Sequence, residues 1–191
     1  MYRLVLPFGL CLLTGVANSQ DKNSVNSGRF VAATRCADAA AEYHKVNPAI
    51  LKAILKVESG GNPLARNLNA NGTEDIGIGQ YNSSNLKALS PFGVDSRDLY
   101  DSCVGTYVSA WHLAKQVKAY GNTWFAIGAY HSTTPFFNKR YQALINNAMV
   151  DLGFANWPKT PIAPLSQATV SRNDKASSVA TSSDGLVAET Q

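Results

Sequence analysis

Several common kinds of binding site lack their usual residues in this chain. The 191 residues include only three histidines, His44, His112 and His131, and these do not share the spacing of metal ligands. No glycine-rich phosphate loop follows a strand-like segment, and the positive charges form no basic run. We therefore predict no metal, no cofactor and no nucleic-acid partner.

Charged residues are also few, at 16% of the chain, and the formal net charge is +4. This mild surplus suits an anionic polymer as a partner but does not identify one. Convincing strand alternation is absent as well, apart from a short ribbon near Asp75 to Gln80. These absences favour an α-rich globular chain.

No apolar run is long enough to span a bilayer comfortably. The run from Leu4 to Val16 is interrupted by Pro7 and Gly9, and Arg3 precedes it. This pattern predicts a secretory signal peptide and therefore an exported protein, although an uncleaved anchor is the alternative interpretation.

Cysteine is scarce, with three residues in the whole chain. Cys11 lies in the leader, so cleavage would leave Cys36 and Cys103. In an oxidising compartment these two permit one intramolecular disulfide. The alternative is a pair of free, buried thiols.

Helical patterns account for most of the middle of the chain. They cover, in order, Ala32 to Val46, Asn47 to Gly60, Ser83 to Leu89, Asp101 to Tyr120, Thr123 to Tyr130, and a last segment that begins at Pro135. Asn47 followed by Pro48 is typical of a helix start, and Gly60 is typical of a helix end. Residues 62–80 are instead rich in turn residues, and long ordered loops are often functional. We predict several short helices around one cleft-forming loop.

These patterns divide the chain into four parts. We expect a signal peptide over residues 1–19, a flexible linker over 20–32, one domain over 33–153 and a disordered, Pro/Ser-rich tail over 154–191. The tail cannot bury enough apolar area to offset the entropy of ordering it. It either holds a partner-binding segment or acts only as a solubilising extension.

Glu58 is the strongest candidate for a catalytic residue. Its spacing from Ile50 and Ile54 is i+8 and i+4, so a carboxylate occupies the core-facing stripe of the predicted helix. Burial and the negative end of the helix dipole should both raise its pKa. A carboxyl that stays protonated near neutral pH can act as the general acid in glycosidic bond cleavage. Taken alone, Glu58 could instead be a surface glutamate at a frayed helix end.

Four segments together resemble a known family. They are Val57 to Pro63 (VESGGNP), Asp75 to Asn82 (DIGIGQYN), the Asp101-Ser102-Cys103 helix start and Ala126 to His131 (AIGAYH). Over about Ala33 to Gly153 the chain resembles the catalytic domain of the soluble lytic transglycosylases. It is most similar to the small members that accompany type IV secretion, type III secretion and pilus systems.

The resemblance implies a mainly α, lysozyme-like (α+β) domain with a saccharide cleft, acting on peptidoglycan strands in the periplasm. There it would open the wall locally for a secretion or conjugation apparatus. The site residues implied are the catalytic acid and base Glu58 and the substrate-binding residues Ser59, Gln80, Asn82, Tyr130 and His131. A disulfide between Cys36 and Cys103 is implied as well. From the residues alone, Gln80 could be a loop amide that satisfies backbone groups, and Tyr130 an ordinary core aromatic.

The chain departs from the family pattern at several places. Gly79 stands where the family usually has Met, and Tyr81 where it has an aliphatic residue. His131 stands where the family usually has Asn, and Ser132-Thr133 replaces a small Ala-Gly pair. These changes put the substrate contacts around His131 in doubt and could lower activity, but they keep the catalytic carboxyl.

Only Glu58 has a persuasive setting, whereas most glycosidases use two carboxylates. The resemblance therefore implies a substrate-assisted cleavage of the β-1,4 bond between N-acetylmuramic acid (MurNAc) and N-acetylglucosamine (GlcNAc), with a 1,6-anhydro product. A hydrolytic muramidase of the same fold, in which Asp75 activates water, is one alternative. A weakly active wall-binding assembly factor is the other.

Overall fold

The computed structural model describes residues 28–168, so the predicted signal peptide and the last part of the predicted tail lie outside the described residues. Within that range the elements follow one another as α2 (Ala37–His44), α3 (Pro48–Ser59), β1 (Arg66–Leu68), β2 (Glu74–Ile76), β3 (Tyr81–Asn82), the 3-10 helices η1 (Ser83–Ala88), η2 (Ser90–Phe92) and η3 (Asp98–Tyr100), α4 (Ser102–Tyr120), α5 (Trp124–Ala129) and α6 (Pro135–Asp151). The prediction of a mainly α fold is confirmed. None of the helices described is both long and apolar enough to cross a bilayer.

The helix boundaries follow from local capping. The Asn47 side chain accepts hydrogen bonds from the backbone N–H groups of Ala49 (2.8 Å) and Ile50 (3.2 Å), which fixes the start of α3. At the other end of α3, Gly60 adopts a left-handed conformation with φ of 66°. The predicted start and end of the helix that carries Glu58 are therefore confirmed.

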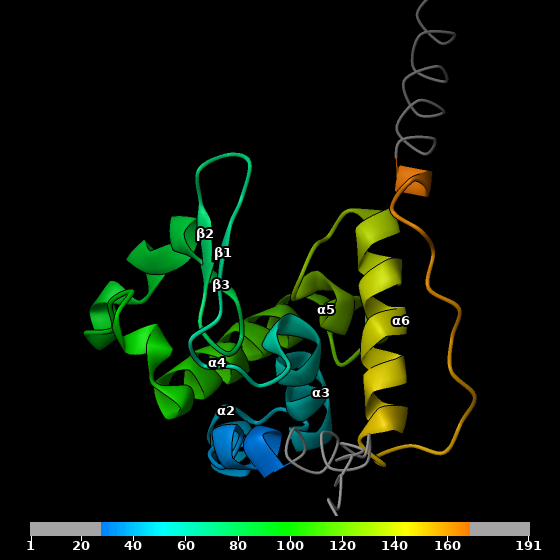
Figure 1. The fold of residues 1–191 in the computed structure, drawn as a ribbon, viewed down its shortest axis with the longest axis horizontal. Helices are drawn as coiled ribbons and strands as arrows, with labels where there is room; N and C mark the ends of the chain where they lie inside the picture. Colours follow the sequence, from blue (N-terminus) through cyan, green and yellow to red (C-terminus); the bar gives the residue numbers. More distant parts are fainter. Residues whose placement is uncertain (1–27, 169–191) are drawn as a thin grey trace, which may run out of the picture.

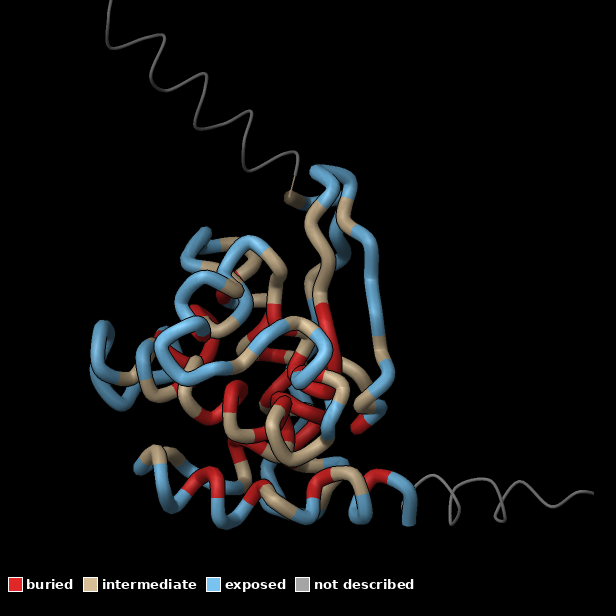
Figure 2. The backbone as a smooth tube through the Cα atoms, turned by 90° about the vertical axis from the view of Figure 1, so that its left-hand side faces the viewer, coloured by how far each residue is buried: buried red, intermediate tan, exposed pale blue. Residues whose placement is uncertain are grey.

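Helix α3 is the centre of the domain and packs against α2, α4 and α6 (Figure 1). Ile54 faces a core cluster shared with α4, α5 and α6, whereas Leu55 faces a second cluster shared with α2 and α4. Both side chains are fully buried, and each contributes roughly 1.5–3 kcal/mol to stability. Figure 2 shows the buried stretches gathered in the middle of the molecule. Because α3 is packed on two sides, its C-terminal end has a fixed position.

A small antiparallel sheet with the order β1-β2-β3 projects from the helical body (Figure 1). Asp75 on β2 pairs with both Asn67 on β1 and Asn82 on β3. The ribbon predicted near Asp75 to Gln80 overlaps β2, but it was predicted too long, since residues 77–80 form a turn. Strands β1 and β3 are too short, at three and two residues, to give a recognisable alternation.

The domain begins before the predicted boundary at residue 33. Residues 28–33 are helical, and the Phe30 side chain is buried at 7% exposure within the cluster between α2, α3 and α4. Phe30 also lies so close to Gly61 that a Cβ there would come within 2.5 Å of its ring. The end of the predicted linker is thus part of the packed domain, because the Phe30 side chain is buried in the apolar core.

Residues 154–168 also differ from the predicted disorder, and we call them the C-terminal strap. The strap runs back beside α6 (Figure 1). Asn147 on α6 accepts from the Thr160 N–H at 2.7 Å and donates to the Thr160 carbonyl at 2.9 Å. Arg140 donates through Nε to the Ala163 carbonyl at 3.0 Å. Side chains of α6 therefore satisfy the strap backbone, which composition alone could not reveal.

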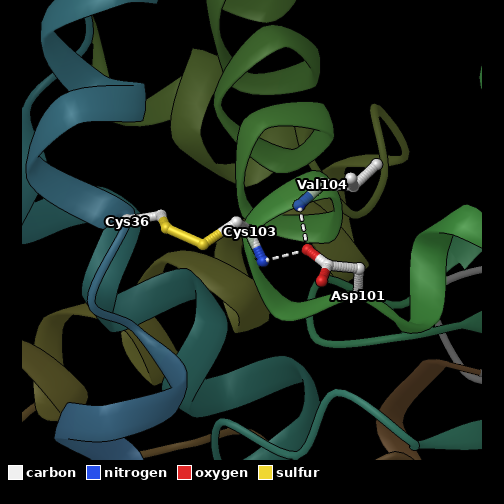
Figure 3. Close-up of a disulfide and its surroundings, with 4 residues drawn as sticks. All are labelled: Cys36, Asp101, Cys103 and Val104. Carbon is white, nitrogen blue, oxygen red and sulfur yellow. Dashed lines mark hydrogen bonds between the residues drawn. A yellow bond between two sulfur atoms is a disulfide. The ribbon is translucent and has the colours of Figure 1, made fainter.

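A disulfide joins Cys36, at the start of α2, to Cys103, in the first turn of α4 (Figure 3). Their Cα atoms lie 5.4 Å apart. The neighbouring Asp101 caps α4 by accepting from the N–H groups of Cys103 and Val104. The pairing implied by the family resemblance is confirmed, and the alternative of two free thiols is wrong.

Removing this bridge should destabilise the domain. The cysteines are 67 residues apart in sequence, and closing a loop of that length is worth about 4 kcal/mol in the chain-entropy model. We expect the double variant Cys36→Ser/Cys103→Ser to lose free energy of unfolding on this scale in urea titrations. Reduced wild-type protein should match it, and an unchanged midpoint would contradict the assignment.

Candidate active site

A cleft of about 790 Å³ opens between the sheet and the end of α3. Glu58 lines it from α3, Gln80 and Gly79 come from the turn after β2, and Tyr130 and His131 follow α5. The sheet side is lined by amide side chains, namely Asn67, Asn69, Asn71, Asn82 and Asn85. Amides both donate and accept hydrogen bonds, as the hydroxyl and acetamido groups of saccharides require.

Glu58 is partly buried at the last turn of α3. Burial raises the pKa of its carboxyl from 4.5 to about 7, and the negative charge of Asp75 acts in the same direction. A hydrogen bond from the Tyr141 hydroxyl to Glu58 Oε1 opposes this shift and lowers the pKa. Burial prevails, so the expected raised pKa is confirmed, whereas the expected helix-dipole contribution stays a prediction.

Tyr141 is the functional residue that the sequence did not single out. It lies on the last predicted helix, which begins at Pro135, and 83 positions separate it from Glu58. A buried tyrosine hydroxyl needs a hydrogen-bond partner, but nothing local in the sequence names that partner. Burial and the nearby Glu58 charge raise the pKa of Tyr141, so its hydroxyl remains a donor.

Ser59 and Tyr130 hold the turn at residues 77–80 from opposite sides. The Ser59 hydroxyl donates to the Ile78 carbonyl at 2.7 Å, and the Tyr130 hydroxyl donates to the Gly79 carbonyl at 3.0 Å. Tyr130 also stacks on Tyr141, with ring centroids 6.3 Å apart. Both hydrogen bonds position the turn. Tyr130 lines the cleft, whereas Ser59 is not among the residues that line it, so the role of Ser59 in substrate binding stays a prediction.

The predicted binding residues Gln80 and Asn82 line the cleft, but their amides are partly engaged. The Gln80 side chain donates to the carbonyls of Gly77 (2.9 Å) and Ala65 (3.3 Å). Its side-chain nitrogen therefore satisfies backbone carbonyls of the loop, as the alternative interpretation of Gln80 predicts. Asn82 donates to Asp75 at 2.7 Å and accepts from the Ser84 N–H at 3.0 Å. Their roles in substrate binding remain predictions.

His131 lies at the mouth of the cleft and stacks on the Tyr141 ring, with centroids 5.1 Å apart. His112 was not singled out, yet it lines the same cleft, and its Nε2 lies 3.2 Å from the Tyr130 carbonyl. Burial lowers the pKa of His112, which favours the neutral ring. No group of three or more His, Cys, Asp or Glu side chains within residues 28–168 could hold a metal ion.

Gly79 has no room for a side chain. A Cβ at this position would lie 1.8 Å from Ser109 Oγ and 3.0 Å from the Tyr130 hydroxyl. The space that a larger residue would need here is therefore filled by α4 and by Tyr130. This departure from the family pattern is matched by the packing around it.

Asp75 is the second carboxylate of the cleft. Its Oδ1 accepts from Asn82 at 2.7 Å, and its Oδ2 accepts from Asn69 at 3.0 Å. Both oxygens therefore take part in holding the sheet together. Its negative charge nevertheless influences Glu58, as described above.

Replacing Tyr141 should change the titration of Glu58. The Tyr141→Phe variant removes the hydrogen bond that lowers the Glu58 pKa, so this pKa should rise above about 7. NMR titration of the carboxyl would measure the shift, with Tyr120→Phe, at an exposed position on α4, as the control. A Glu58 pKa that stays the same or falls would contradict the assignment.

The buried Glu58 should also make stability depend on pH. A folded-state pKa of about 7 against an ordinary 4.5 means that the favourable contribution is complete below pH 4.5 and is lost as the pH rises through about 7. Glu58→Gln does not titrate, so its stability relative to wild type should increase over this window by at most about 3 kcal/mol. Denaturant unfolding at several pH values would measure it. Glu42→Gln, at an exposed position, is the control. A difference in unfolding free energy between Glu58→Gln and wild type that does not change with pH would contradict the expectation.

Comparison with known proteins agrees with this geometry. The model of the Transglycosylase SLT domain family matches residues 35–144. Protein IpgF of Shigella flexneri is 37% identical over 100 residues, which cover 52% of this chain and 66% of IpgF. Invasion protein IagB of Salmonella typhimurium is 34% identical over 96 residues, covering 50% of this chain and 60% of IagB. The match thus spans slightly less than two thirds of these relatives. This chain belongs to the transglycosylase SLT domain family.

Proposed function

We propose that this protein is a lytic transglycosylase that cleaves the β-1,4 bond between MurNAc and GlcNAc in peptidoglycan. The observation that carries the proposal is Glu58, whose carboxyl has a pKa raised to about 7 and lines a cleft rich in amide side chains. At neutral pH a large share of this carboxyl is protonated and can act as a general acid. The family membership supports peptidoglycan as the substrate.

The proposed reaction needs one carboxyl and the substrate itself. Glu58 donates its proton to the bridging oxygen as the bond from that oxygen to C1 of MurNAc breaks. The 2-acetamido group of MurNAc stabilises the positive charge at C1. The Glu58 carboxylate then takes the proton of the MurNAc C6 hydroxyl, whose oxygen bonds to C1 and gives the 1,6-anhydro product. This step restores protonated Glu58, and the intramolecular attack benefits from proximity.

The contacts of the two carboxylates favour this scheme over hydrolysis. Tyr141 holds Oε1 of Glu58, while no described residue hydrogen bonds to Oε2. Both oxygens of Asp75, in contrast, already accept amide hydrogen bonds. The Asp75 oxygens are therefore less available to take a proton from water, as hydrolysis would require. Hydrolysis with Asp75 as the base remains the second candidate, because its charge acts on Glu58 from within the same cleft.

We further propose that the protein acts in the periplasm and opens the wall locally for a secretion or conjugation apparatus. The relative IagB is named as an invasion protein, which supports a specialised role of this kind. So does the size of the domain, since a single small domain suits local opening more than bulk turnover of the wall.

Mass spectrometry of the sugars released from purified peptidoglycan tests the proposal. We expect 1,6-anhydro products from the wild-type protein and a loss of about 10³-fold in Glu58→Gln, because general acid–base catalysis contributes on this scale. Glu42→Gln, at an exposed position on α2, should retain wild-type release. Reducing-end products would instead establish hydrolysis. No release from folded protein would favour the wall-binding assembly factor.

A further inference from the structure

A second recess of about 190 Å³ opens on the other side of Glu58. Glu58 and His131 line both this recess and the main cleft, so the two cavities meet at the candidate catalytic carboxyl. Arg140 on α6 and Leu165 on the C-terminal strap also line the recess. Leu165 lies beyond residue 144, where the family match ends. The strap therefore adds a wall to the site that the family model does not include.

The strap is held in place along α6. Asn147 bonds to both the N–H and the carbonyl of Thr160, and Asn146 donates to the Thr160 hydroxyl at 3.0 Å. The bond from Arg140 Nε to the Ala163 carbonyl fixes the strap two residues before Leu165. Leu165 itself is 59% exposed, so an apolar side chain faces outward beside the recess. The wall is thus built by specific hydrogen bonds rather than by a buried core.

Arg140 brings a positive charge without a counter-charge. It is partly buried, and only its Nε has a hydrogen-bond partner among the described residues. No carboxylate of residues 28–168 forms an ion pair with it. Burial, followed by the charge of Arg140, lowers the pKa of His131, which indicates that the positive charge acts at the cleft. A guanidinium with free terminal amino groups is well suited to bind a carboxylate through two parallel hydrogen bonds.

We propose that this recess is a subsite for the peptide stem of peptidoglycan, in which Arg140 binds a stem carboxylate and Leu165 contacts the aliphatic part of the stem. The inference rests on the proposed function, because it takes peptidoglycan as the substrate. The stem is attached to MurNAc, the sugar on which Glu58 acts, and it carries negative charge. The recess is also about a quarter of the size of the cleft, as expected for a side group rather than a glycan strand.

Binding of glycan strands with and without their stems tests this subsite. The Glu58→Gln protein is used, so that nothing is cleaved, and the stems are removed enzymatically from half of the strands. We expect Arg140→Gln to weaken binding of stem-bearing strands about tenfold, as for the loss of one charged hydrogen-bonded pair, and to leave stem-free strands unaffected. Lys139→Gln removes the same charge from the neighbouring, exposed position and should change neither. Equal weakening on both kinds of strand, or none, would overturn the proposal.

A second pair of variants tests the strap. Leu165→Glu places a carboxylate beside Arg140, where it should compete with the stem and again weaken only stem-bearing strands. Ile162→Glu puts the same charge on the strap at an exposed position that does not line the recess, so it should have no effect. If both glutamates act alike, the recess is not the binding site.

The binding experiment also separates this inference from the proposed function. If Glu58→Gln binds both kinds of strand with equal affinity and Arg140 has no influence, only the subsite is refuted. If it binds neither kind, peptidoglycan is not the substrate and both proposals fall. A wild-type protein that releases no product, but whose binding depends on stems and on Arg140, would refute the enzyme alone.

Discussion

The site depends on a carboxyl held at the end of a helix that is packed on two sides. Helix α3 carries Ile54 into one core cluster and Leu55 into the other, so its last turn cannot move independently. Glu58 is placed by this packing in surroundings that oppose its ionisation. Burial destabilises the charged form of Glu58 and so keeps the carboxyl protonated near neutral pH. The property that the chemistry needs therefore costs folding stability when Glu58 ionises.

Tertiary contacts also complete the site around that carboxyl. Tyr141 donates to it from α6, and Ser59 and Tyr130 donate to carbonyl oxygens of the turn at residues 77–80, part of which lines the same cleft as Glu58. A Cβ at Gly79 would collide with Ser109, so the absence of a side chain there lets the turn pack against α4. This one departure from the family pattern therefore fits the packing around it.

The ends of the domain were the least predictable part of the fold. Phe30 and the C-terminal strap both lie in segments whose composition indicated no order, yet each is held by contacts with residues distant in the sequence. Composition measures how much apolar area a segment can bury by itself. It cannot show that side chains of α6, such as Asn147, form hydrogen bonds with the backbone of the strap. Strands β1 and β3 were missed for a related reason, because pairing rather than alternation defines them.

The sequence by itself determined the helices α3, α4, α5 and α6, the caps at Asn47 and Gly60, and the identity of Glu58 as the candidate acid, because periodicity and capping are local properties of the chain. The family motifs added the positions of Gln80, Tyr130 and the disulfide. Only the tertiary structure decided that Tyr141 bonds to Glu58, that the Gln80 amide is engaged by its own loop, and that the strap reaches the site. These contacts depend on how the chain packs, and the local patterns of a single sequence do not show which side chains the packing brings into contact.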